Sequence, residues 1–213
     1  HTVLLLDHEG ANKSKLTKND LTLADLAQNV SDTLHELSLQ TKKIILIGHS
    51  MSGMLVNYIN IHSNLPIYKS VLIGPVHPTP KLTQIFLDRI TSLKESQSLI
   101  PFSNTIPEAA TGDKCSDLKK AFIRQLIQGN TVDGYIANCH AIASGASYDL
   151  DYSKVKSPTL VLYGTQDNTA PYTGCVEVIA NGIPDVKAVP LDVGHWLVIE
   201  DDESVLKEIV EFI

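Results

Sequence analysis

Residues 44–53 read Ile-Ile-Leu-Ile-Gly-His-Ser-Met-Ser-Gly, and this segment constrains the fold more than any other part of the chain. The apolar run Ile44–Ile47 is typical of a buried strand, and a helical pattern begins soon after Ser50. A strand that passes into a helix through so short a turn holds one residue in a strained, exposed conformation. The residues two positions before and after Ser50 then lie close together, so Gly48 and Ser52 must both be small. The segment therefore predicts that Ser50 is held as a nucleophile.

The size and composition of the chain argue against several classes of protein. With 213 residues, of which 43% are hydrophobic, the chain can bury one core, so we expect a single globular domain. A formal net charge of −7, with no dense Lys/Arg cluster, argues against a nucleic-acid partner. No apolar run approaches the roughly 18–20 residues of a membrane span, so no membrane partner is expected.

The cysteines and the first residues of the chain indicate in which cellular compartment the protein is found. The opening residues lack the basic segment of a signal peptide. The three cysteines are few, odd in number and widely spaced, which is typical of reduced thiols and not of a disulfide framework: Cys115, Cys139 and Cys175. We therefore expect an intracellular, cytoplasmic protein.

Apolar runs alternate with helical periodicity along much of the chain. Five runs are expected to be strands: Val3–Leu6, Ile44–Ile47, Val71–Ile73, Thr159–Tyr163 and Val186–Val189. Between and after them, helical spacing is found from Thr22 to Leu37, from Met54 to Ile61 and from Ser204 to Ile213. Strands that alternate with helices predict an α/β fold, a mostly parallel sheet with helices on both faces.

One long segment departs from this alternation. After a proline-rich stretch at residues 74–80, the pattern is helical only, with helices expected over Leu82–Leu93, Leu118–Ile127 and Val132–Ile142 and loops around 103–112 and 129–130. An all-helical insertion between two strands indicates a lid over the carboxyl ends of the strands, where such sheets bind ligands. We expect residues 1–76 and 153–213 to form the core, and residues 77–152 the helical lid.

A serine hydroxyl is a weak nucleophile and needs a base that a third group orients. Asp167 follows the strand Thr159–Tyr163, and His195 follows the strand Val186–Val189. Taken singly, Ser50 could cap a helix, Asp167 could belong to a turn, and His195 could pack in the core. The order Ser, Asp, His, each in a loop after a parallel strand, favours a catalytic triad.

The segment Gly48–Gly53 resembles the nucleophile elbow of the α/β-hydrolase superfamily, with Ser52 where a glycine is usual. Gly164 to Pro171 and Gly194-His195-Trp196 resemble the acid and histidine motifs of the same superfamily, and the resemblance spans nearly the whole chain. Within it, residues 134–142 followed by Asp149-Leu-Asp151 resemble 3-oxoadipate enol-lactonases and their relatives. The resemblance implies a hydrolase that acts on a small carboxylate lactone. The only arginines of the lid are Arg89 and Arg124, and neither is clearly placed to bind a carboxylate.

An acyl-transfer site also needs donors for the oxyanion of its intermediate. The backbone N–H of Met51 is expected to be one of them. In the superfamily the other usually comes from a loop after an earlier strand, and the present chain begins after that point. We therefore expect the chain to be N-terminally truncated relative to the full protein.

The remaining candidates lie around the site. His140 on a lid helix and Trp196 beside the histidine are expected to line the substrate pocket, although both could simply pack. His49 is expected to pack in the elbow. No metal-ligand spacing and no phosphate-binding glycine loop is present, so neither a metal nor an organic cofactor is expected.

The sequence thus predicts a serine hydrolase that cleaves an ester or lactone of a small molecule through Ser50, His195 and Asp167. Two alternatives within enzymes are a general carboxylesterase and a hydrolase of carbon–carbon bonds. A third alternative is a ligand-binding or signalling protein with little turnover, because strigolactone and karrikin receptors also carry a serine at the position of Ser52.

Overall fold

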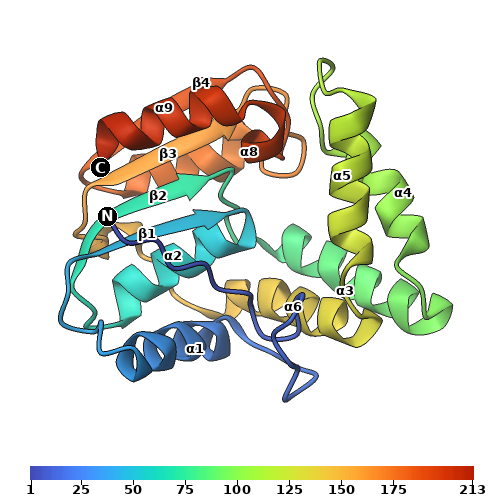
Figure 1. Ribbon diagram of the computed structural model, residues 1–213, viewed down its shortest axis with the longest axis horizontal. Helices are drawn as coiled ribbons and strands as arrows, with labels where there is room; N and C mark the ends of the chain where they lie inside the picture. Colours follow the sequence, from blue (N-terminus) through green and yellow to red (C-terminus); the bar gives the residue numbers. More distant parts are fainter.

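Four parallel strands form one sheet, and their order in space is the same as their order in the chain. The computed structural model describes residues 1–213. The strands are β1 (Ile44–His49), β2 (Ile67–Ile73), β3 (Thr159–Gly164) and β4 (Val186–Leu191) (Figure 1). Each contains a run that its sequence predicted. Because all four are parallel, the loops that follow them emerge at the same edge of the sheet.

Helices cover both faces of this sheet, as the alternating pattern predicted (Figure 1). On strand β3, Leu160 and Leu162 pack with the C-terminal helix α9 (Asp202–Phe212), whereas Val161 packs on the opposite face. That opposite face is covered by three helices, α1 (Leu23–Glu36), α2 (Met51–His62) and α7 (Glu177–Gly182). Because both faces of β3 are buried, its consecutive residues Leu160, Val161 and Leu162 are all apolar.

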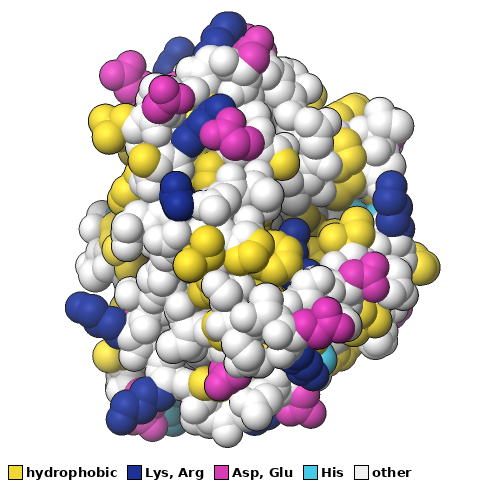
Figure 2. Space-filling view, turned by 90° about the vertical axis from the view of Figure 1, so that its right-hand side faces the viewer, with side chains coloured by type: hydrophobic (Ala, Val, Ile, Leu, Met, Phe, Trp, Pro, Cys, Tyr) yellow, Lys and Arg dark blue, Asp and Glu magenta, His cyan; other side chains and the backbone are white.

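Between β2 and β3 the chain forms a helical insertion of four helices: α3 (Pro80–Ser96), α4 (Ile100–Ala109), α5 (Asp117–Gln128) and α6 (Val132–Ser144). The insertion lies on the side toward which the strands point (Figure 1). Figure 2 shows hydrophobic side chains exposed on the side of the molecule where the insertion lies. Leu118 and Phe122 of α5 are among the exposed hydrophobic residues. No helix of the structure has both the length and the apolar character required to cross a membrane.

Helix α4 corrects one prediction, since residues 103–112 were expected to form a loop. Pro101 lies in the first turn of α4, where a proline removes no helical hydrogen bond. Ser103 and Pro107 are buried, and Ser103 Oγ accepts a hydrogen bond of 2.9 Å from Gln128 on α5. Pro107 lies inside the helix, where a proline is unfavourable, so packing against α5 stabilises α4 despite this residue.

The N-terminal run Val3–Leu6 corrects another prediction, since it was expected to be a buried parallel strand. The run has no regular secondary structure, and Val3 and Leu5 are 77% and 89% exposed. No strand pairs with it, so its backbone groups form no sheet ladder and its side chains have no layer to pack against. β1 is accordingly an edge strand of the sheet, and Ile47 is 51% exposed.

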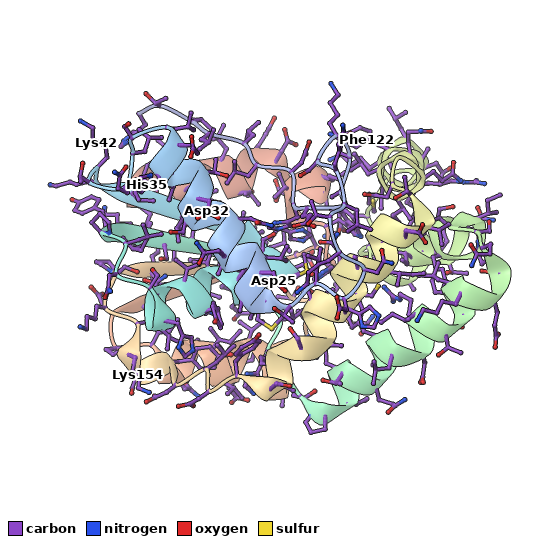
Figure 3. The ribbon with its side chains drawn as sticks, turned by 90° about the horizontal axis from the view of Figure 1, so that it is seen from below. Asp25, Asp32, His35, Lys42, Phe122 and Lys154 are labelled. Carbon is purple, nitrogen blue, oxygen red and sulfur yellow. The ribbon has the colours of Figure 1, made fainter.

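Helix α1 joins the core to the insertion. It begins with a capping box, in which Thr22 accepts from the backbone of Asp25 and the Asp25 carboxylate accepts from the backbone of Thr22. Figure 3 shows Asp25 at the end of α1 that lies nearest to α6. There, the backbone N–H of Leu23 donates to Ser144 Oγ over 2.9 Å.

The loop at residues 7–14 packs tightly against α6. Asn138 on α6 donates to the carbonyl oxygen of Glu9 over 2.9 Å. A Cβ added at Gly134 would overlap the carbonyl oxygen of Gly10, so this contact requires a helix position without a side chain. Gly10 itself has φ +78°, a conformation that favours glycine.

We predict that Gly134→Ala destabilises the protein by about 2–3 kcal/mol, because the added methyl group must displace the Gly10 backbone. Gly129→Ala is the matched control, since a Cβ there has no neighbour closer than 3.5 Å. Urea unfolding of both variants measures the difference. Equal stability of the two would contradict the tight contact between α6 and the loop.

Candidate active site

Ser50 lies in the turn between β1 and α2 with φ 56° and ψ −117°, a strained conformation for a residue with a side chain. Its backbone N–H donates to the carbonyl oxygen of Ile73 on β2 over 2.9 Å. A Cβ at Gly48 would overlap the carbonyl oxygen of Ser52, so the turn closes only with glycine at position 48. The strand, turn and helix that the sequence predicted are thus present, with the serine at the carboxyl edge of the sheet.

The structure brings all three predicted triad residues together. His195 Nδ1 lies 2.7 Å from Asp167 Oδ2, and His195 Nε2 lies 2.9 Å from Ser50 Oγ. Asp167 and His195 are both buried, at 4% and 5% exposure. With Nδ1–H donating to the carboxylate, Nε2 is left as the acceptor for the serine O–H. This is the arrangement in which an imidazole can remove the serine proton.

The Asp167 carboxylate is held by its own loop. Its Oδ1 accepts from the backbone N–H groups of Thr169 and Ala170, each over 2.8 Å, which leaves Oδ2 for His195. At the end of β2, Gly74 has φ +48°, and a Cβ there would lie 3.4 Å from His195 Nδ1 and 3.5 Å from Asp167 Oδ2. A residue without a side chain at the end of β2 therefore leaves room for the His–Asp pair.

Met51 begins helix α2, directly after Ser50. Its backbone N–H is the first of the helix, so it has no acceptor one turn earlier within α2. Such an N–H at a helix N-terminus is free to bind a negative oxygen. The predicted oxyanion role of Met51 agrees with this position.

His49 packs beside His195, and Trp196 packs against His49. His49 Nε2 lies 2.7 Å from the carbonyl oxygen of His195, and the two rings lie 4.9 Å apart. The Trp196 ring lies 5.7 Å from that of His49, and its Nε1 is buried without a hydrogen-bond partner. Two effects lower the pKa of His49 to about 4: first its burial, and second the charge of the nearby His195. His49 is therefore neutral at pH 7, and its Nε2–H donates to the carbonyl oxygen of His195.

Ser52, the residue that stands where the superfamily usually has glycine, has a partner in the loop at residues 7–14. Its Oγ shares a hydrogen bond of 2.7 Å with His8 Nε2. Burial lowers the pKa of His8 below its usual value, against the opposing effect of Asp7. The hydroxyl of Ser52 is therefore engaged with His8 and leaves Ser50 as the serine that faces His195.

The predicted pocket residue His140 is not joined to the triad by any hydrogen bond or ring contact. It is half-buried on α6, and the charges that act on it belong to Lys94 and Asp20. The two arginines of the insertion are also placed elsewhere. Arg89 lies against the rings of Phe86 and Phe102 and donates to Tyr135, and Arg124 is exposed on α5.

Sequence reasoning missed Glu200, whose carboxylate accepts backbone N–H groups on both sides of His195. It also missed the contact of His8 with Ser52 and the space that Gly74 provides. A single sequence gives no signal for these three, because each depends on which loops meet in space.

We predict that His49 makes stability depend on pH. The unfolded chain binds a proton on His49 near pH 6.5 whereas the folded chain does so only near pH 4, so this contribution to stability is lost as the pH falls from 6.5 to 4. The loss is about 3 kcal/mol. His49→Gln keeps an N–H donor but does not titrate, so urea unfolding at a series of pH values should show a shallower decline. An identical decline would contradict the assignment.

We also predict that Ser52→Gly destabilises the protein by about 1–2 kcal/mol. The variant loses the hydrogen bond to His8 and places a glycine in the first turn of α2. Ser52→Ala removes the hydroxyl without the glycine and separates the two effects. If both variants are as stable as the wild type, the Ser52–His8 contact contributes nothing to folding.

Comparison with known proteins agrees with the geometry of the site. The profile of the alpha/beta hydrolase fold family matches residues 1–202. Monoacylglycerol lipase ABHD6 of Mus musculus is 25% identical over 221 residues, and the Homo sapiens protein is 24% identical over the same length. The alignments include 97% of this chain but 65% and 64% of those relatives, so the chain spans less than two thirds of their length.

Solved structures show the same fold. The enol-lactonase from Burkholderia xenovorans LB400 matches with a TM-score of 0.85 and 21% identity, over 97% of this chain and 78% of the other. A thermophilic esterase from Thermogutta terrifontis matches with a TM-score of 0.84 and 22% identity, over 97% and 77%. With the strand order, the elbow and the family profile in agreement, the chain belongs to the alpha/beta hydrolase fold family.

Proposed function

We propose that the protein is a serine hydrolase that cleaves carboxylic esters of small molecules. The observation that carries the proposal is the hydrogen-bonded series Asp167–His195–Ser50, with distances of 2.7 Å and 2.9 Å. Asp167 and His195 are each exposed by 5% or less, which keeps water from competing for these hydrogen bonds. The strained turn, which holds Ser50 against His195, further supports the proposal.

In the proposed reaction, Ser50 Oγ attacks the ester carbonyl carbon while its proton passes to His195 Nε2. The N–H of Met51 donates to the carbonyl oxygen as it becomes an oxyanion. His195 then gives the proton to the leaving alcohol oxygen, and an acyl-enzyme remains on Ser50. Water, deprotonated by His195, attacks the acyl carbon. The bond to Ser50 Oγ then breaks, His195 returns the proton to that oxygen, and the carboxylic acid leaves. Asp167 stabilises the imidazolium in both steps.

The insertion is proposed to act as the lid that selects the substrate. The relatives named monoacylglycerol lipase and esterase support an ester substrate, and the fold neighbour named enol-lactonase keeps a lactone as a second candidate. The specific prediction of a carboxylate lactone gains no support from the arginines, since Arg89 is engaged with aromatic rings and Tyr135. A neutral ester therefore fits the site better. The predicted pocket role of His140 and the cytoplasmic location stay predictions.

We predict that Ser50→Ala abolishes hydrolysis of a p-nitrophenyl ester and labelling by a fluorophosphonate probe, since the probe reacts only with an activated serine. Ser52→Ala is the matched control in the same turn and should keep both. A wild-type protein that hydrolyses no member of a panel of monoacylglycerols, lactones and simple esters, and that the probe does not label, would favour a ligand-binding role.

We predict that Asp167→Asn lowers kcat by roughly 10³–10⁴-fold, because an amide no longer stabilises the imidazolium or fixes its tautomer. Asp185→Asn is the control, an exposed aspartate whose side chain makes no hydrogen bond. Far-ultraviolet circular dichroism and thermal unfolding verify that both variants fold. Near-normal turnover by Asp167→Asn would assign the acid role to another residue.

A further inference from the structure

Three segments that are distant in the sequence meet behind His195. They are the acid loop at residues 165–171, the histidine loop at residues 192–196, and the turn of the helical insertion at residues 110–113, which joins α4 to α5. We call the last of these the insertion turn. It belongs to the insertion and not to the strand edge that supplies the triad.

The carboxylate of Glu200 lies where the histidine loop and the insertion turn meet. Glu200 ends α8 (Leu197–Glu200), one turn after His195. Its Oε2 accepts from the N–H of Gly112 over 2.7 Å and from the N–H of Gly194 over 3.0 Å, and its Oε1 accepts from the N–H of Trp196 over 3.0 Å. One carboxylate thus satisfies three backbone donors, two of which flank His195.

The insertion turn also contacts the histidine loop directly. The N–H of His195 donates to the carbonyl oxygen of Ala110 over 2.8 Å. A Cβ at Gly194 would lie 2.5 Å from the carbonyl carbon of Thr111, so the two backbones pack without room for a side chain. Because His49 binds the carbonyl oxygen of His195, both backbone polar groups of the histidine are held, one of them by the insertion.

The insertion turn reaches the acid loop through Gln166, the residue before Asp167. Gln166 Oε1 accepts from the N–H of Asp113 over 2.8 Å, and Gln166 Nε2 donates to Asp113 Oδ1 over 3.0 Å. The insertion makes one more contact near the histidine loop, since Lys119 Nζ of α5 donates to the carbonyl oxygen of Glu200 over 2.8 Å. The insertion is therefore fixed to the loops of both the acid and the base.

We propose that Glu200 is a positioning residue for His195. Its hydrogen bonds hold the histidine loop against the insertion turn and so fix the place of the imidazole. The proposal rests on the proposed function, because it assigns Glu200 a role through the base of that reaction. An ionised carboxylate accepts at both oxygens, which matches three converging N–H groups, whereas an amide presents a donor at one of the two positions. The imidazole position is thus set by the insertion as well as by the β4 edge.

The test compares Glu200→Gln and Glu200→Ala with the control Glu203→Gln, an exposed glutamate nearby whose side chain makes no hydrogen bond. We expect kcat for the best ester of the panel to fall by about 10- to 100-fold in both Glu200 variants, with KM changed little, since a shift of the base affects the chemical step. Glu203→Gln should behave as the wild type.

A second readout does not depend on turnover. The downfield proton resonance of His195 Nδ1–H, which donates to Asp167 over 2.7 Å, reports whether the imidazole keeps its place. It should be present in the wild type and in Glu203→Gln, and broadened or shifted in the Glu200 variants. A wild-type protein with neither this resonance nor ester turnover would refute the proposed function itself.

A third variant tests the insertion side. A Cβ at Gly112 would lie 3.0 Å from Gln166 Oε1, 3.0 Å from the N–H nitrogen of Gly194 and 3.2 Å from Glu200 Oε2. Gly112→Ala should therefore lower kcat and disturb the His195 resonance although it lies in the insertion. An active wild type whose Glu200→Gln and Gly112→Ala variants keep normal kcat and resonance would overturn the positioning role. Unfolding of the conservative Glu200→Gln variant would also overturn it, since Glu200 would then hold the fold and not the histidine.

Discussion

The close approach of Gly48 to the Ser52 carbonyl is the contact on which the rest of the site depends. It permits β1 to turn into α2 within one residue, and it places Ser50 at φ 56° with its side chain toward His195. The same turn leaves the N–H of Met51 at the start of α2. One steric condition thus fixes both the proposed nucleophile and one proposed oxyanion donor.

The parallel sheet supplies the other two members of the proposed triad because its strands end together. β3 and β4 are paired in register from Thr159 with Val186 to Gly164 with Leu191, so the loops of Asp167 and His195 leave the sheet side by side. β2 lies between the serine strand and the acid strand, and its Gly74 leaves the space in which the His–Asp pair lies. The geometry of the site therefore follows from strand register and from two glycines.

The helical insertion also holds two loops, one that contacts Ser52 and one that contains His195. Through α6 it holds the loop at residues 7–14, which in turn contacts Ser52 through His8. Through the insertion turn it holds the histidine loop at Ala110 and Gly112. A movement of the insertion would therefore act on both sides of the Ser50–His195 pair.

Apolar runs, glycine and proline positions and the order Ser, Asp, His are local or sequential properties, and by themselves they determined the α/β class, strands β1 to β4, the elbow and the triad candidates. Only the tertiary structure decided whether a run is paired or packed: Val3–Leu6 has no neighbouring strand, and α4 is a helix because it packs against α5. The same reason applies to Glu200, whose proposed role depends on its hydrogen bond with Gly112, a residue 88 positions away in the chain. Contacts across such separations leave no periodic pattern in one sequence, so they were fixed by packing and not by local preference.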